Sequence, residues 1–332
     1  MMTVPHPVGM KVCTPFAVCI LMAVLSACTD RTSPGNPSGG RDTSPAGQAS
    51  VYDDSAQFLL KSGRINEALG YVNKALTLEP ANPEFFVTLS DIYLGMNNPE
   101  KAKDALNKAS DLAPLDAVPN FKKGYLHLVL KDYTLAREYF KKAIGLQPVY
   151  PQSYFHLGIT YLETGDTARA IQDLQTAAQQ DEAYLDALIL LGSLFEQRDP
   201  GVAAAYYRNA IRIDSANIQL RYNLGMLLQQ TGNDSLAMDQ YLRILAIDSS
   251  YFPASYNLGY LCLVNRGDYA RAIRYFDHSL RMNPSYVDAL YNRGLCFEIL
   301  GDKERARSDY REALRILPNF ERAVEGMNRL DE

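Results

Sequence analysis

Histidine, cysteine and serine are side chains through which a protein carries out acid–base or nucleophilic chemistry. Of the four histidines in this 332-residue sequence, His127, His156 and His278 have no metal-ligand spacing with one another or with cysteine. The sequence contains no glycine-rich phosphate loop and no G-x-S-x-G motif. We therefore expect these three histidines to lie on helix surfaces or in the core. We expect no enzyme activity, no small-molecule substrate, no metal and no other cofactor.

The overall charge excludes a second class of function. The formal net charge is −5, whereas general nucleic-acid binding requires a basic surface. The chain has no Trp but 22 Tyr, so most of its aromatic surface is tyrosine, whose apolar ring and polar tip suit binding surfaces. Composition thus favours partners other than nucleic acid.

One cysteine has a distinctive context. An apolar run at 12–27 follows Lys11; it is too short for a typical membrane-spanning helix and ends in "LSAC", residues 25–28. This segment resembles the lipobox of bacterial lipoproteins, [LVI]-[AST]-[GA]-C. The resemblance implies that residues 1–27 are a signal peptide and that Cys28 carries a diacylglycerol thioether and an N-terminal acyl chain such as palmitate. The alternative is an ordinary secretory signal with a chance cysteine.

The resemblance also bears on location. In enteric lipoproteins an Asp directly after the lipidated Cys retains the protein in the inner membrane, and here that residue is Thr29. We expect a lipid anchor in the outer membrane, facing the periplasm. Residues 28–48, rich in Ser, Thr, Pro and Gly, are expected to form a disordered tether. Cys262 and Cys296 lie beyond the tether; we expect buried free thiols, with a disulfide as the alternative.

Beyond the tether, small residues recur with a period of about 34 residues. An alanine usually follows twelve residues later and a large apolar residue four residues after that, as Ala170 and Leu174 follow Gly158. The glycines in this register are Gly124, Gly158, Gly192, Gly225, Gly259 and Gly294. The pattern resembles the tetratricopeptide repeat, W-x2-L-G-x2-Y…A-x3-F…A…P, with Trp always replaced.

The repeats tile residues 49–320 without gaps. The eight copies are 49–82, 83–116, 117–150, 151–184, 185–217, 218–251, 252–286 and 287–320. The resemblance implies an all-α fold: a right-handed superhelical solenoid of about eight helix hairpins, each with a helix A followed by a helix B. Residues 321–332 are expected to form a C-terminal capping helix with a stripe of Phe320, Val324, Met327 and Leu330. Turns such as "TGD" (164–166) and "TGND" (231–234) predict Gly after helix A and a capping Asp before helix B.

The family resemblance also assigns a binding surface. In tetratricopeptide repeats, positions two, five, nine, twelve and thirteen of helix A line a concave groove. The aromatic residues at these positions are Phe121, Tyr125, Phe155, Tyr222, Tyr256, Tyr260 and Tyr291. Among the carboxylates there are Asp91, Glu163, Glu196 and Glu298, with only Lys61 as a cation. We expect partly exposed rings among carboxylates, suited to a partner segment with Lys or Arg and apolar anchors. The alternative is that fifth-position rings pack on the next repeat.

The sequence therefore indicates a lipid-anchored scaffold or adaptor that binds protein or peptide partners. Such a protein suits cell-envelope assembly, secretion or the docking of peptidoglycan enzymes. Two alternatives remain: a self-assembling structural subunit, and an accessory subunit of a periplasmic enzyme.

Overall fold

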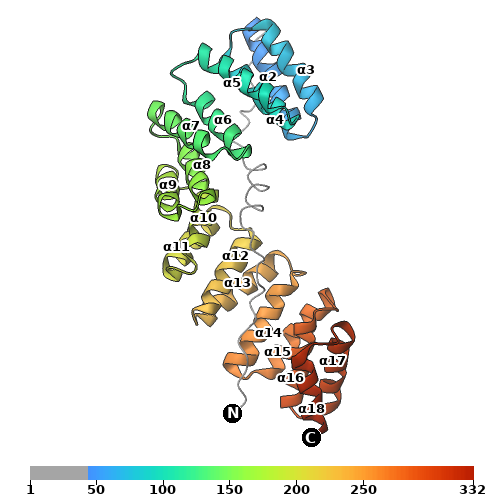
Figure 1. Cartoon of the computed structure of the whole chain (residues 1–332). Coiled ribbons are helices and arrows are strands. Elements are labelled where there is room, and N and C mark those ends of the chain that lie inside the picture. The colour runs from blue at the N-terminus through green and yellow to red at the C-terminus, as the bar shows by residue number, and fades with distance from the viewer. Residues whose placement is uncertain (1–43) are drawn as a thin grey trace. The chain divides into compact units, whose positions relative to one another are not determined.

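The computed structural model describes residues 44–332, and the regular structure of this part is entirely helical (Figure 1). The helices are α2 (Pro45–Lys61), α3 (Ile65–Leu78), α4 (Pro83–Gly95), α5 (Pro99–Leu112), α6 (Ala117–Val129), α7 (Tyr133–Leu146), α8 (Pro151–Glu163), α9 (Thr167–Gln180), α10 (Leu185–Phe195), α11 (Pro200–Ile213), α12 (Ile218–Gln230), α13 (Asp234–Ile247), α14 (Phe252–Arg266), α15 (Tyr269–Met282), α16 (Val287–Ile299), α17 (Lys303–Ile316) and α18 (Glu321–Asp331). The predicted all-helical fold of paired hairpins is confirmed.

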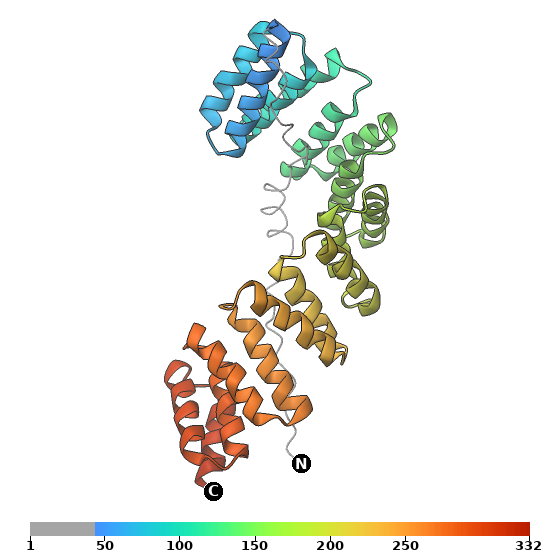
Figure 2. The ribbon, with the colours of Figure 1, turned by 180° about the vertical axis from the view of Figure 1, so that it is seen from behind.

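The described residues fall into two compact units, 44–187 and 188–332, which divide within α10. In the N-terminal unit, α2 packs on α3, α4 on α5, α6 on α7 and α8 on α9. In the C-terminal unit, α12 packs on α13, α14 on α15 and α16 on α17, and α18 lies against α16 and α17. Both views show these hairpins as neighbouring antiparallel helix pairs (Figure 1, Figure 2).

The N-terminal boundary of the first hairpin differs from the prediction. Helix α2 begins at Pro45, so the tether predicted over 28–48 is wrong for its last residues. Ser44 accepts a hydrogen bond from the Gly47 amide, and Pro45 occupies the first helical turn. A capping Ser followed by Pro is a helix start, which the Ser/Pro/Gly composition concealed. The predicted signal peptide, Cys28 and the rest of the tether lie outside the described residues.

The turns within hairpins follow their sequence signals. Gly165 has φ +81°, a conformation that glycine adopts without strain. Asp166 then caps α9 by accepting from the Arg169 amide at 3.1 Å. The cap predicted for "TGND" is wrong, because Asp234 is already the first residue of α13. Its carboxylate instead accepts from Asn265 Nδ2 at 2.7 Å, which joins neighbouring hairpins.

Close helix approach explains the recurring glycine of helix A. A Cβ placed on Gly294 would lie 2.8 Å from Tyr310 Cε1, closer than a real Cβ contact allows. On the other edge of the Tyr310 ring lies Gly326 of α18, whose Cβ would be 2.6 Å from Cε2. Glycine at these positions therefore lets α16, α17 and α18 enclose one ring.

The C-terminal capping helix is present, and of its predicted stripe Leu330 is buried and Phe320 packs on Tyr291, but Val324 is exposed. Ala323, Gly326 and Leu330 form the buried side of α18, whereas Val324 is 40% exposed. Cys262 and Cys296 are both buried thiols, and neither forms a disulfide, as expected. Within residues 44–332, no helix combines the length and apolar character needed to cross a membrane.

Candidate protein-binding surface

The residues predicted to line a groove lie on the first helix of their hairpins, or directly after it. They are Asp91 (α4), Phe121 and Tyr125 (α6), Phe155 and Glu163 (α8), Glu196 (after α10), Tyr222 (α12), Tyr256 and Tyr260 (α14), and Tyr291 and Glu298 (α16). They are spread over both units, and we consider each unit by itself. Their positions in the helices agree with the repeat register, but their exposure does not agree with the expectation.

Most of the predicted rings are buried. Phe155 is only 4% exposed, Phe121 and Tyr291 are 5% exposed, and Tyr260 is 8% exposed. The expectation that Phe155 is partly solvent-accessible is therefore wrong. Tyr125, Tyr222 and Tyr256 are half-buried, so only these three rings are available to a partner to an appreciable extent.

The aromatic residues at the fifth position each belong to a ring pair that recurs within repeats. The fifth-position ring packs against an aromatic residue at the last position of the same repeat, with ring centroids 4.9–5.8 Å apart. The pairs are Phe121–Tyr150, Phe155–Tyr184, Tyr222–Tyr251, Tyr256–Tyr286 and Tyr291–Phe320. Copies whose fifth residue is not aromatic end in Asn82, Asp116 and Asn217. This co-occurrence was visible in the sequence, and it indicates that each of these rings packs within its own repeat, which buries Phe121, Phe155 and Tyr291 and leaves Tyr222 and Tyr256 half-buried.

Neighbouring repeats are also joined through the tyrosine hydroxyls. Asn257 Nδ2 donates to Tyr222 Oη at 3.4 Å, and Asn292 Nδ2 donates to Tyr256 Oη at 3.1 Å. In both pairs the amide lies at the sixth position of the following repeat. The fifth-position tyrosine therefore packs its ring within its own repeat and directs its hydroxyl to the next one.

The predicted carboxylates have partners within the fold. Glu298 accepts hydrogen bonds from both Arg329 nitrogens at 2.8 and 3.0 Å and from Tyr310 Oη at 2.5 Å. Burial alone would raise the pKa of Glu298, but these hydrogen bonds hold it below its usual value. Glu196 accepts from Tyr207 Oη at 2.6 Å in the same way.

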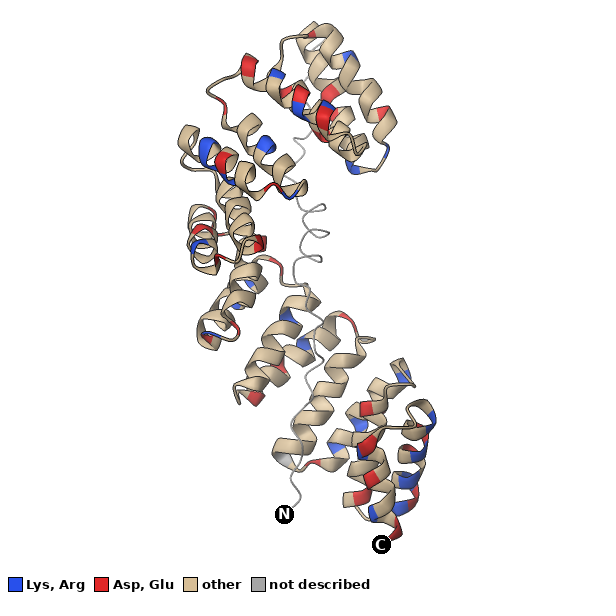
Figure 3. Ribbon diagram, in the orientation of Figure 1, with Lys and Arg blue, Asp and Glu red and all other residues tan. Residues whose placement is uncertain are grey.

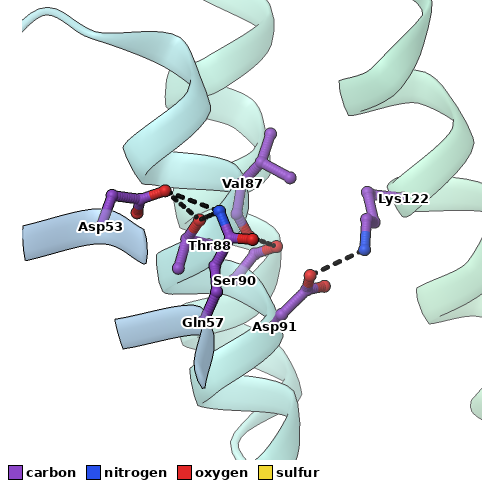
Figure 4. Close-up of polar contacts among 7 residues, drawn as sticks. All are labelled: Asp53, Gln57, Val87, Thr88, Ser90, Asp91 and Lys122. Carbon is purple, nitrogen blue, oxygen red and sulfur yellow. Dashed lines mark hydrogen bonds and ion pairs between the residues drawn. The ribbon is translucent and has the colours of Figure 1, made fainter. Parts of the chain in front are cut away.

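Two further carboxylates link helices of the N-terminal unit. Lys122 Nζ of α6 donates to Asp91 Oδ2 of α4 at 2.7 Å, as Figure 4 shows. Tyr133 Oη donates to Glu163 at 3.2 Å. Two predicted groove carboxylates, Asp91 and Glu298, are therefore neutralised by cations that lie outside the predicted groove positions, Lys122 and Arg329.

A buried carboxyl group marks the first hairpin. Asp53 is only 5% exposed. Its Oδ2 accepts from Gln57 Nε2 at 2.7 Å and from Thr88 Oγ1 of α4 at 3.2 Å (Figure 4). Its buried Oδ1 has no hydrogen-bond partner. Burial raises the pKa of Asp53, against the lowering effect of its two donors.

His156 lies in the core, one of the two locations expected for the histidines. His156 is enclosed by the rings of Phe121, Tyr125 and Phe155, with centroids 5.2–5.5 Å away. His156 Nδ1 lies 2.8 Å from the Gln152 carbonyl, to which it donates, while the buried Nε2 has no partner. Burial lowers the pKa of His156 to about 4. The neutral imidazole of His156 therefore packs in the core with the aromatic rings around it.

One pair with catalytic appearance was not anticipated from the sequence. Ser255 Oγ lies 2.7 Å from His278 Nδ1. Ser255 is fully buried, however, so no substrate can approach its hydroxyl, and the contact joins α14 to α15. Among the described residues, no group of three or more His, Cys, Asp or Glu side chains could hold a metal ion.

Tyr222 and Tyr256 are the half-buried rings of the predicted set in the C-terminal unit, and the buried Asn257 and Tyr260 lie against them. Asn257 Nδ2 contacts both Tyr222 Oη and Met226 Sδ, and the Tyr256 and Tyr260 ring centroids are 6.4 Å apart. We call Tyr222, Met226, Tyr256, Tyr260 and Asn257 the tyrosine surface. Helix α14, which supplies three of these residues, carries Arg266 as its only charged residue. Figure 3 shows the contrast with α16–α18, where both signs of charge are dense.

This arrangement is that of a helical-hairpin repeat protein, a scaffold fold that is typically non-catalytic. Sequence profiles described as Tetratricopeptide repeat match residues 59–119, 121–184, 155–218, 193–252 and 254–319. The chain belongs to the tetratricopeptide repeat family.

Two curated relatives are distant and longer than this chain. The chain is 23% identical over 279 residues to human protein O-mannosyl-transferase TMTC3, covering 82% of this chain and 30% of TMTC3. It is 25% identical over 245 residues to human DnaJ homolog subfamily C member 7, covering 70% of this chain and 48% of that protein. The chain thus spans less than half the length of these two relatives.

Solved structures support the fold. The C-terminal part of a repeat-containing protein from Cytophaga hutchinsonii aligns with a TM-score of 0.53 at 18% identity, covering 82% of this chain and 98% of that one. YrrB, described as a TPR protein with an unusual peptide-binding site, aligns with a TM-score of 0.50 at 23% identity. That alignment covers 58% of this chain and all of YrrB.

Proposed function

We propose that this protein is a lipid-anchored scaffold of the bacterial cell envelope, and that it binds a protein partner through the tyrosine surface of its C-terminal unit. Proteins of this family mediate protein–protein interactions, and YrrB has the same fold together with a described peptide-binding site. The anchor is Cys28, in the outer membrane on the periplasmic side, and its support is the "LSAC" sequence after an apolar run.

The observation that carries the binding site is the half-buried state of Tyr222 and Tyr256, with half-buried Met226 one helical turn after Tyr222 on α12. Half-buried tyrosine rings offer apolar area that is already held in place, so little side-chain entropy is lost on binding. The polarizable Met226 thioether adapts to varied apolar groups. The partner segment therefore presents apolar or aromatic side chains. Charge contributes less to its binding than it would in an acidic groove.

Substitution of Met226 tests the site with limited damage to the core. Met226→Glu places a charge at the centre of the tyrosine surface, and the matched control Leu242→Glu changes a 44%-exposed residue of α13. A photocrosslinker at Gln219, an exposed residue of α12, first identifies the partner in intact cells by mass spectrometry. Met226→Glu should then weaken binding of the purified partner by about tenfold or more, whereas Leu242→Glu should not. Equal binding by both variants would contradict the site.

The anchor has a separate test. Cys28→Ala should abolish labelling by a radioactive or clickable fatty acid and release the protein from the membrane fraction. If the Ala variant still sediments with membranes and keeps the mobility of the original protein, the lipoprotein proposal is wrong. Protease treatment of intact cells that removes the folded region would instead place the protein on the cell surface.

A further inference from the structure

The third hairpin, residues 117–150, concentrates positive charge. It contains six Lys and Arg residues and two Asp and Glu residues, so its formal net charge is +4, whereas that of the whole chain is −5. Figure 3 shows Lys and Arg on both of its helices, α6 and α7. The hairpins on either side, residues 83–116 and 151–184, have formal net charges of −3 and −4. They neutralise part of this charge, as Asp91 does for Lys122.

Two lysines of the third hairpin share one tyrosine ring. Lys142 Nζ lies 4.8 Å from the centroid of the Tyr139 ring, and Lys123 Nζ lies 5.8 Å from the same centroid. His127 stacks on this ring with the centroids 5.5 Å apart. In the part of the chain that the structure describes, neither Lys123 nor Lys142 forms an ion pair. One ring therefore holds two ammonium groups that the repeats do not neutralise.

The eighth repeat shows how a cation at the same position is neutralised. Arg293 directly precedes Gly294, as Lys123 directly precedes Gly124. The Arg293 guanidinium donates to both oxygens of Asp309 at 2.7 and 2.9 Å and to Asp277 Oδ1 at 2.7 Å. Two carboxylates thus hold this arginine.

The third repeat has neither of these carboxylates. Asp309 precedes the ring that packs on Gly294, and the residue that precedes the corresponding ring on Gly124 is Tyr139. The residue that corresponds to Asp277 is Asn107, which likewise follows the large apolar residue of its helix. The third repeat therefore keeps the cation but replaces both of its acidic partners.

The surroundings of Lys123 make its charge unfavourable. Lys123 is half-buried, and burial lowers its pKa; Asp111 of α5 opposes this shift, and Lys142 adds to it. A half-buried cation with a like charge nearby and no paired carboxylate costs stability. Departures of this kind from the usual rules are found mainly at functional sites. We call Lys123, Lys142, Tyr139 and His127 the lysine site.

The groups around the lysine site determine which anion fits. The positive charge of Lys103 on α5 also reaches His127, whereas Asp132 Oδ2 lies 3.8 Å from His127 Nδ1. Asp111 and Asp132 thus border the site without pairing with its lysines. A membrane surface or a nucleic acid would bring many negative charges against both carboxylates at once, whereas one acidic side chain can lie between the lysines.

The segment that precedes α2 is not complementary to the lysine site. Residues 1–43 contain two Asp, each adjacent to an Arg, and one Lys, so their formal net charge is +1. The anion must therefore come from elsewhere.

We propose that the lysine site binds an acidic segment of a partner protein, with an Asp or Glu carboxylate between Lys123 and Lys142. The Tyr139 ring holds both ammonium groups near each other before binding, so little side-chain entropy is lost. This surface is separate from the tyrosine surface, which lies in the other unit, and the proposal does not depend on it.

Fluorescence anisotropy of a fluorescein-labelled hexaglutamate peptide, titrated with the full chain in a non-ionic detergent at low salt, tests the site. The peptide should bind, and its affinity should fall as salt is added. Lys123→Gln and Lys142→Gln should each weaken binding by about tenfold.

The first hairpin supplies a matched control. Lys74 Nζ lies 4.6 Å from the Tyr71 ring centroid, at the repeat positions of Lys142 and Tyr139, but Ser55 stands where the third hairpin has Lys123. Lys74→Gln should therefore leave the peptide affinity unchanged. Absence of peptide binding, or equal losses in Lys74→Gln and Lys123→Gln, would overturn the proposal.

Melting temperatures separate a binding role from a structural one. Lys123→Gln should melt no lower than the parent protein, because it removes an unpaired charge. Arg293→Gln should melt lower, because it leaves the buried Asp309 without its cation. A Lys123→Gln variant that melts well below the parent would assign Lys123 to the fold instead, and displacement of the peptide by an equal concentration of inorganic phosphate would identify a phosphate site instead of one for an acidic segment.

Discussion

Acidification should loosen the N-terminal unit around His156. This imidazole is fully buried, and its Nε2 has no hydrogen-bond partner. Protonation would place a second N–H and a positive charge among the rings of Phe121, Tyr125 and Phe155, where neither is solvated. The folded state therefore resists protonation, whereas the unfolded chain takes up a proton at the ordinary histidine pKa.

The sign and size of the effect follow from linkage. The pKa of His156 is lowered from 6.5 to about 4 on folding, so its contribution to stability is complete above pH 6.5 and is lost as pH falls toward 4. The free energy of unfolding should fall by about 2 kcal/mol at pH 5 and about 3 kcal/mol at pH 4 from this group. Hydrogen-exchange mass spectrometry over α6–α9, corrected for the intrinsic exchange rate, measures this local stability.

A His156→Asn variant isolates the histidine. Asn has no titration in this range, and it is the residue at the same repeat position in Asn257 and Asn292. The comparison is necessary because Asp173, whose pKa burial raises to about 6, titrates in the same window with the opposite sign. The difference between the two proteins should grow from pH 6.5 to pH 4. A pH-independent difference would refute the assignment of a neutral, unprotonated His156.

Three further substitutions test the packing. Asp53→Asn should stabilise the first hairpin at pH 7, because it keeps an accepting oxygen and removes a buried charge. The gain in stability should vanish at a pH where the carboxyl group of Asp53 is protonated. An Asn variant that melts at a lower temperature than the original protein at pH 7 would contradict this. Gly294→Ala should cost about 1–3 kcal/mol in the free energy of unfolding, since its Cβ would meet Tyr310, and an unchanged denaturation midpoint would show that the ring can move. Phe155→Ala should lower the free energy of unfolding by about 3–5 kcal/mol, because the ring packs on Tyr184. A loss below about 1 kcal/mol would indicate that Phe155 is a surface residue, as the repeat register alone suggests.

The repeat architecture was predictable because its signals are periodic and local. A small residue at the eighth position of helix A permits close approach at every hairpin, and the contact of Gly158 with Leu174 is the one that the spacing predicts. Turn residues are equally local: Gly165 and Asp166 set the end of one helix and the start of the next. Two boundaries were misplaced: at Ser44, whose cap sits inside a biased composition, and at Asp234, which begins α13 instead of capping it.

The exposure of the rings was not predictable from the register alone. A repeat position specifies which side of helix A a residue occupies, but not whether another side chain covers that side. Phe155 is buried because Tyr184, twenty-nine residues later in the same repeat, closes over it. The sequence signal for this burial is that an aromatic residue at the fifth position of a repeat occurs together with an aromatic residue at its last position. It is found by comparing two positions within each repeat, not by comparing one position across all repeats.

The repeat position of a carboxylate likewise does not show whether another side chain already pairs with its charge. Glu298 has the position and charge of a residue that attracts a basic partner, yet Arg329 of the capping helix already occupies both of its oxygens. A basic peptide would have to displace a bidentate, charge-assisted pair before gaining anything from this group. The same holds for Asp91, which Lys122 engages from the next hairpin. In the function proposed above, a partner would therefore draw its binding energy from apolar contact with Met226 and with the half-buried rings of Tyr222 and Tyr256.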